Sequence, residues 1–201
     1  MTLTRMIRFV PLAFAPVLLA GCISFGAEAP PSLLTLTPRA TLQAGSAVQA
    51  TESSAIAVAE PGVPQKISVT RVPVQVDETT IAYLKDAVWV ERPARLFQQL
   101  LAETLRARGN TVVVDGDDPE FLAATQLRGT LREFGYDAQA GSVVVRFDAV
   151  RGGGTEPVQT RRFESTVPVI SGDDGPEPGP VGEALNQAAN DVAAQVTDWV
   201  R

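Results

Sequence analysis

The sequence contains no histidine and a single cysteine, Cys22, among its 201 residues. These absences exclude disulfides within the chain, zinc sites built from cysteine and histidine, and nucleophilic sites that use histidine as the base. We therefore expect no catalytic residue, no metal site and no cofactor, and the chain is predicted not to be an enzyme. A hydrolase that uses only carboxylates is the open alternative, and it requires two acidic side chains that converge in a pocket.

Positive charge is also scarce, with 17 Lys and Arg residues against 23 Asp and Glu residues. The first 21 residues hold Arg5 and Arg8 and no acid, so the rest of the chain has 15 basic and 23 acidic side chains and a net charge of about −8. Such a chain lacks the basic footprint of a nucleic-acid-binding protein and the polybasic segments that hold anionic lipids. Attachment to a membrane would therefore have to come from acyl chains.

Residues 1–21 have the pattern of a bacterial lipoprotein signal. Two arginines precede an apolar run over residues 9–19, and the sequence Leu19-Ala20-Gly21-Cys22 then places small residues directly before the cysteine. This order of charge, apolar run and small residues is typical of an export signal. It predicts signal cleavage between Gly21 and Cys22 and lipid attachment at Cys22.

A membrane-spanning helix is the alternative for this segment, because residues 9–27 carry no charge. Pro11 and Pro16 argue against one continuous helix there. We expect residues 22–32 to form a tether to the membrane and residues 33–201 to form one α+β periplasmic domain. Residues 39–54 are rich in Ala, Gln, Ser and Thr and are expected to form a flexible loop within that domain.

Two amphipathic helices are predicted. The first opens with Glu91, Arg92 and Pro93 and ends at Gly109, since proline is tolerated in a first turn and glycine favours a helix end. Residues 181–200 form the second. Apolar residues recur at three- and four-residue spacing in both, at Leu96, Phe97, Leu100, Leu101 and Leu105, and at Leu185, Ala189, Val192, Val196 and Trp199. Asn186, Gln187, Asn190, Asp191, Gln195 and Asp198 are expected on the outer face of the second helix.

Strands are predicted at residues 33–37, 55–59, 67–76, 79–90, 111–114, 125–136, 143–150 and 158–169. Pro73 confines its strand to a sheet edge or a bulge. The last three strands alternate in polarity and are joined by short turns that contain glycine, a pattern typical of an antiparallel meander. The sequence thus predicts a mainly antiparallel sheet with two amphipathic helices packed on one face.

Two short motifs carry no chemistry. Asp115, Asp117 and Asp118 resemble the start of a calcium loop, but the chain lacks the glycine and glutamate that an EF-hand places at positions six and twelve. Residues 152–154 are three glycines without the Gly-Lys-Ser/Thr that follows in a phosphate-binding loop. Both are interpreted as turns.

The segment Trp89-Val90-Glu91-Arg92-Pro93, with the helix after it, resembles the ABC-type transport auxiliary lipoproteins. These accompany MCE-type (mammalian cell entry) lipid-transport systems of Gram-negative bacteria. The family combines a lipobox, an early strand similar to residues 34–38, and a Trp-acidic-Pro motif before an amphipathic helix. A strand pair similar to residues 127–136 and 143–149 follows, and a closing helix similar to residues 185–199 ends in tryptophan.

The resemblance implies a non-enzymatic lipoprotein that faces the periplasm and assists an MCE/ABC-type machine in moving lipids between the membranes. Its implied partner is an MCE-domain protein, with ABC permease and ATPase subunits at the inner membrane. The candidate partner-binding residues are Trp89, Glu91, Arg92 and Pro93, because interfaces favour an aromatic or arginine anchor. For Trp89 a place in the core is the alternative.

Ile23 follows the cysteine where aspartate commonly retains enterobacterial lipoproteins in the inner membrane, so the outer membrane is the expected destination. An envelope assembly or scaffold lipoprotein, such as a pilotin-like factor unrelated to transport, is the alternative function. Self-association into a homo-oligomer stays open.

Overall fold

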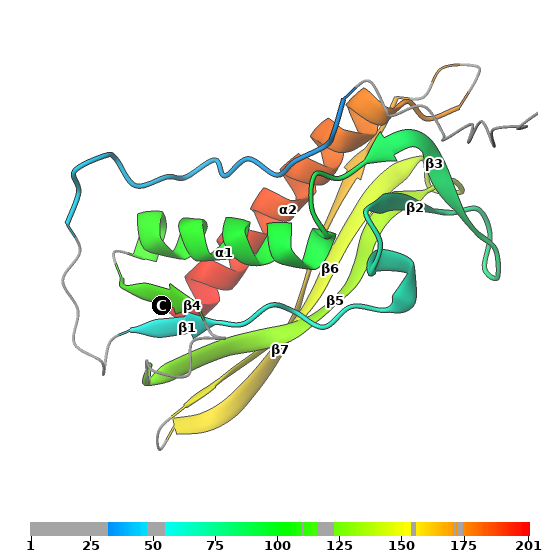
Figure 1. Ribbon diagram of the computed structural model, residues 1–201. Helices are drawn as coiled ribbons and strands as arrows, with labels where there is room; N and C mark the ends of the chain where they lie inside the picture. The colour runs from blue at the N-terminus through cyan, green and yellow to red at the C-terminus, as the bar shows by residue number, and fades with distance from the viewer. Residues whose placement is uncertain are drawn as a thin grey trace, which may run out of the picture.

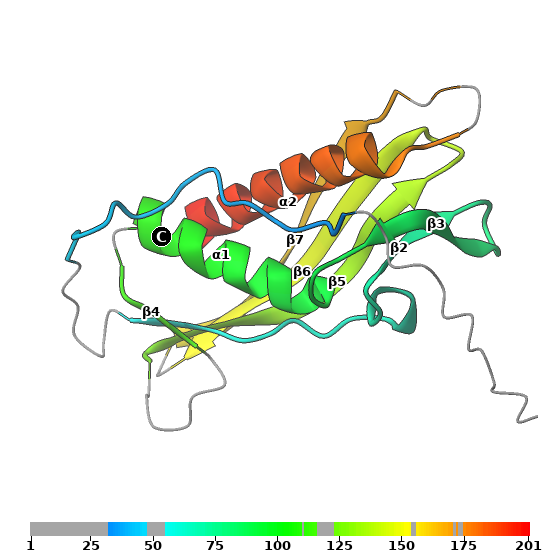
Figure 2. The ribbon, with the colours of Figure 1, turned by 45° about the horizontal axis from the view of Figure 1, so that its top comes forward.

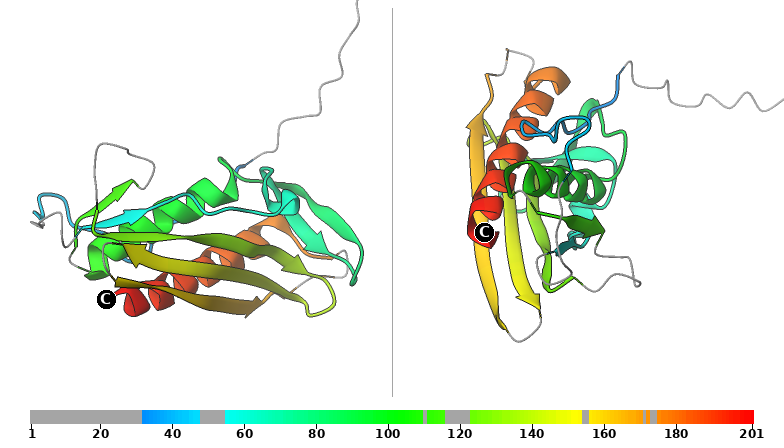
Figure 3. Two further views of the ribbon diagram at one scale, coloured as in Figure 1. Left: turned by 90° about the horizontal axis from the view of Figure 1, so that it is seen from below. Right: turned by 90° about the vertical axis from the view of Figure 1, so that its left-hand side faces the viewer.

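The computed structural model describes residues 32–47, 55–109, 111–115, 123–153, 156–170, 172 and 175–201. The signal, Cys22 and the rest of the tether up to residue 31 lie outside them, as do residues 48–54 of the expected loop and residues 116–122, which include most of the acidic turn. The described residues form a seven-stranded mixed sheet with two helices on one face (Figures 1, 2 and 3). The predicted α+β class is confirmed.

Three long antiparallel strands form the main part of the sheet: β5 (Thr125–Asp137), β6 (Ser142–Gly153) and β7 (Glu156–Pro168). Leu131, Phe147 and Phe163 are cross-strand partners and are all buried on the helix side. The residues between such positions point to the opposite, open face and are mostly charged or polar, as strand alternation requires. The predicted meander is confirmed.

The other strands pair along the far edge of β5. β1 (Ile56–Val58) lies between β5 and β4 (Val113–Asp115) and runs parallel to both, and all three of its residues are buried. β2 (Arg71–Gln75) lies between β5 and β3 (Ile81–Val88), after the short 3-10 helix η2 (Gln65–Ile67). The β2–β3 register shifts between Arg71 and Pro73, so proline occupies an irregular position inside the sheet and not an edge.

The two helices are α1 (Pro93–Gly109) and α2 (Pro178–Val200). They contact each other, and α2 packs along β6 and β7 while α1 packs on β1 and β4. Phe97 contacts Phe147 edge to face at a ring distance of 5.3 Å, which joins α1 to the centre of the meander. Each helix buries the predicted apolar stripe, although Trp199 is only partly buried.

Residues 32–47, which we call the strap, cross both helices without forming a full strand (Figure 2). The strand predicted at residues 33–37 is reduced to one bridge between Leu34 and Trp89. Beyond it, the strap is held by side chains. The Thr37 amide donates to Asn186 Oδ1 at 2.8 Å, and the Leu42 amide donates to Glu103 Oε1 at 2.9 Å.

Asn190 departs from its expected place on the outer face of α2, since it is only 4 % exposed. Its side-chain Oδ1 accepts from the Arg39 amide at 2.8 Å, and its Nδ2 donates to the Thr37 carbonyl at 3.0 Å. The amide side chain thus replaces a backbone partner for the strap, and the strap in turn covers Asn190. Helical periodicity groups Asn190 with the polar residues of α2, but it carries no information that a distant segment covers this side chain.

Candidate functional site

The segment between β3 and α1 divides the four candidate partner-binding residues into two pairs. Trp89 is 1 % exposed and packs against Phe134 at a ring distance of 5.4 Å, and Pro93 is also buried. Glu91 and Arg92 are exposed. Burial therefore favours the core alternative for Trp89, and only Glu91 and Arg92 present side chains to a partner in this conformation.

Two exposed aliphatic side chains, Leu33 and Val90, belong to the same segments as Glu91 and Arg92 and the residues that pair with them. Leu34 pairs with Trp89, with the Leu34 amide donating to the Val88 carbonyl and the Val90 amide donating to the Leu34 carbonyl, both at 2.8 Å. Side chains alternate along extended chain, so Leu33 and Val90 point away from the core on the same side. They are 52 % and 56 % exposed.

Leu33, Val90, Glu91 and Arg92 together form what we call the junction surface. Arg92 Nη2 lies 3.3 Å from Glu60 Oε1, and Glu91 Oε2 accepts from Gln99 Nε2 at 3.4 Å. The sequence alone does not single out Leu33 and Val90, although each lies next to an inward-facing position of an extended segment. Exposed apolar side chains beside an arginine fit the apolar centre and the arginine enrichment of protein interfaces.

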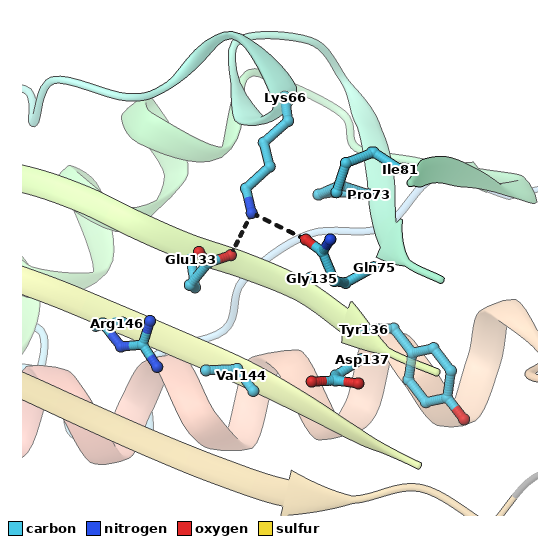
Figure 4. A pocket seen from close by; sticks show the side chains of 10 residues that line it. All are labelled: Lys66, Pro73, Gln75, Ile81, Glu133, Gly135, Tyr136, Asp137, Val144 and Arg146. Carbon is cyan, nitrogen blue, oxygen red and sulfur yellow. Dashed lines mark hydrogen bonds and ion pairs between the residues drawn. The ribbon is translucent and has the colours of Figure 1, made fainter. Parts of the chain in front are cut away.

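A second candidate site is a pocket of about 160 Å³ between the β2–β3 hairpin and the open face of the sheet (Figure 4). Lys66 Nζ lies 2.6 Å from Glu133 Oε2 and 3.5 Å from Gln75 Oε1. Ile81, Val144 and Arg146 also line it. No sequence signal links Lys66 to Glu133, because 67 positions separate them.

The pocket does not supply the converging acidic pair that a carboxylate hydrolase requires. Glu133 is paired with Lys66, and Asp137 accepts from the Gln139 and Ala140 amides at 2.9 and 3.0 Å as part of a turn. The two acids are four residues apart on one strand, roughly 13 Å at the rise of an extended chain. Carboxylates that act together on a glycosidic bond lie about 5–9.5 Å apart.

The open face of the sheet carries one strongly stabilised carboxylate. Asp148 on β6 accepts from Arg162 Nε at 2.6 Å and from Arg132 Nε at 2.9 Å. The hydrogen bond from Arg162, more than the one from Arg132, lowers the pKa of Asp148 from 3.8 to about 2. These ion pairs join side chains of three neighbouring strands and stabilise their pairing.

We expect an Asp148→Asn variant to lose about 1 kcal/mol of unfolding free energy at pH 7, the scale of an exposed ion-pair network. The folded-state pKa is depressed, so this stabilisation is complete above pH 3.8 and disappears as the pH falls towards 2. Urea unfolding at pH 7, 5, 4 and 3 should therefore show the variant converging on the wild type. The control is Glu78→Gln, an exposed carboxylate at the β2–β3 turn, which should show no such convergence.

Neither a metal site nor a membrane span emerges from the part of the chain that the structure describes. Its Asp and Glu residues form no group of three or more that could hold a metal ion. Neither α1 nor α2 is long and apolar enough to cross a membrane.

Comparison with solved structures shows the same fold. The chain is 19 % identical to the protein XCC0632 from Xanthomonas campestris, of the family DUF330, with a TM-score of 0.68 over 84 % of this chain and 94 % of that one. It is 13 % identical to a second, uncharacterised protein, with a TM-score of 0.62 over 85 % of this chain and all of the other. No curated protein matches the sequence. The family model for the ABC-type transport auxiliary lipoprotein component matches residues 34–197, and the chain therefore belongs to this family of auxiliary lipoproteins.

Proposed function

We propose that this protein is the non-enzymatic, outer-membrane-anchored auxiliary lipoprotein of an MCE/ABC-type system that moves lipids between the two membranes. The observation that carries the proposal is the family match, which spans almost all of the described domain. The lipoprotein signal before Cys22 supports a position in the periplasm. The absence of histidine and of any second thiol from the sequence supports a role in binding and not in covalent chemistry.

We infer that the junction surface binds the MCE-domain protein. Leu33 and Val90 supply an apolar centre, and Arg92 supplies a long cationic side chain that can pair with a carboxylate of the partner. Leu33 is the second residue that the structure describes, so the junction surface includes the point where the proposed tether joins the domain.

An Arg92→Glu variant is expected to lower the yield of co-purified MCE protein by at least about tenfold, the scale of a hot-spot arginine. Its melting temperature should change little, because the Arg92–Glu60 pair is exposed on the arginine side. The matched control is Arg128→Glu, an exposed arginine on the open face of the sheet, which should leave co-purification intact. Equal losses in both variants would exclude the junction surface.

The transport system itself is tested by crosslinking wild-type protein in living cells. We expect an MCE-domain protein among the captured products. If repeated crosslinking captures no MCE component, the transport proposal fails, and an envelope scaffold becomes the better reading.

The outer-membrane location rests on Ile23, which follows Cys22 in place of an inner-membrane retention aspartate. Sucrose-gradient fractionation should place wild-type protein with outer-membrane markers. An Ile23→Asp variant should move it to the inner-membrane fractions. Wild-type protein found with inner-membrane markers would contradict this location.

A further inference from the structure

A groove of about 350 Å³ runs along α1, with the strap as one wall and strands β1 and β4 as the other. Figures 1 and 2 show α1 lying between these two walls. Leu36 and Pro38 of the strap and Val114 of β4 form half-buried rims. Val58, Leu96, Leu100 and Ala102, each less than one-tenth exposed, form the bottom.

The polar side chains that line the groove are already hydrogen-bonded within the protein. Gln98 Nε2 donates to the Val58 carbonyl at 2.8 Å, and its Oε1 accepts from Arg95 at 2.7 Å. Glu103 accepts from the Leu42 amide at 2.9 Å, and Arg106 donates to the Val113 carbonyl at 3.1 Å. A peptide brings its own amides and carbonyls, which cost free energy if buried without partners, whereas a hydrocarbon chain brings none.

The dimensions of the groove also favour a hydrocarbon chain over a peptide helix. The lining spans Arg95 to Arg106, which is about 16 Å at the rise of an α-helix. This is close to half of a ~30 Å bilayer core, the depth that one acyl chain occupies. Divided by that length, the volume of 350 Å³ gives a cross-section of roughly 22 Å², far below that of a helix about 10 Å across.

We propose that this groove holds one acyl chain of a membrane lipid. The apolar bottom contacts the methylenes, and the strap, which is held to the helices mainly by side chains, closes over them. The inference deepens the proposed function and depends on it for its role in transport, because it gives the auxiliary lipoprotein a lipid site of its own. Purified protein tests it without any transport component.

The experiment uses full-length, lipidated protein reconstituted in vesicles of phosphatidylethanolamine and phosphatidylglycerol. One arm contains a phospholipid with a diazirine in one acyl chain, and the other contains a diazirine-labelled free fatty acid. After illumination, we expect lipid adducts on peptides from residues 93–109 and 32–47. Labelling in both arms shows that the chain alone is bound, and labelling only by the phospholipid shows that a headgroup is also needed. Adducts confined to other peptides would overturn the proposal.

Ala102→Trp fills the groove and should lower labelling of these peptides by at least about tenfold, because even one methylene changes binding in a hydrophobic pocket by about 10- to 200-fold. Ala107→Trp, the same change on α1 outside the groove, should leave labelling unchanged. Ala102→Leu serves as a milder variant, and melting curves confirm that each protein is folded. Equal labelling of folded Ala102 and Ala107 variants would refute an acyl chain in the groove.

A photoreactive residue at Val114, on the half-buried β4 rim of the groove, tests in cells whether lipid or protein occupies the groove. Lipid adducts there support the proposal, whereas a crosslinked protein segment without lipid overturns it. Loss of MCE capture in cells, with groove labelling intact in vesicles, would refute the transport proposal alone. MCE capture in cells without groove labelling in vesicles would refute only the acyl-chain site.

Discussion

The Leu100→Asp variant is expected to be unfolded at ambient temperature. Leu100 lies on the buried stripe of α1 and is 1 % exposed, so the new carboxylate would lose its hydration without gaining a partner. Such burial costs several kcal/mol, and a domain of this size has only about 5–15 kcal/mol of stability in total. Circular dichroism should show loss of the cooperative melting transition.

Val192→Asp tests α2 in the same way, because Val192 is fully buried against the sheet. The controls place the same charge on exposed positions of the same helices, as Gln99→Asp and Gln187→Asp, and should melt close to the wild type. A wild-type melting temperature for Leu100→Asp or Val192→Asp would mean that the helix concerned does not cover the sheet.

Both helices and the meander could be predicted because local periodicity specifies them. Leu96 to Leu105 repeat at helical spacing, and Val143, Val145 and Phe147 alternate at strand spacing. Each pattern lies within a single helix or strand, and the apolar residues that define it are the ones buried in the core. The class of the fold follows from these elements alone.

The pairing of the first strands could not be predicted, since it depends on long-range contacts. β1 is only three residues long, and its parallel partners start at Val113 and Thr125, more than fifty positions away. Pro73 signals an irregularity but does not say whether the strand lies at an edge or inside the sheet. The strap is similarly invisible, because its partners are single side chains such as Asn190 and Glu103.

The sequence named Trp89, Glu91, Arg92 and Pro93 as candidate partner-binding residues, and that role stays a prediction. Trp89, the most conspicuous of the four, is buried in the core. A tryptophan carries no mark in the sequence that separates core from interface. Leu33 and Val90 became recognisable only when the Leu34–Trp89 bridge fixed which side chains face outward.

Replacing Cys22 by serine is expected to abolish lipid attachment. Lipoprotein maturation adds a diacylglyceryl group to the thiol and a further acyl chain to the new N-terminus, so a wild type matured at Cys22 would carry more than the two signals that stable anchoring requires. Each buried methylene contributes ~0.8 kcal/mol, so the acyl chains together make release negligible. Serine offers no thiol, and the Cys22→Ser protein should appear as an unprocessed precursor or in the soluble fraction.

The control is Ser24→Ala, which changes a neighbouring hydroxyl and should leave the protein wholly in the membrane fraction. Mass spectrometry of the wild type should show Cys22 as an acylated N-terminal residue, with residues 1–21 removed. Intact precursor that resists carbonate extraction, with no acylated Cys22, would instead support the spanning helix over residues 9–27. That result would contradict a lipid anchor at Cys22, because an uncleaved transmembrane segment would then attach the domain to the membrane.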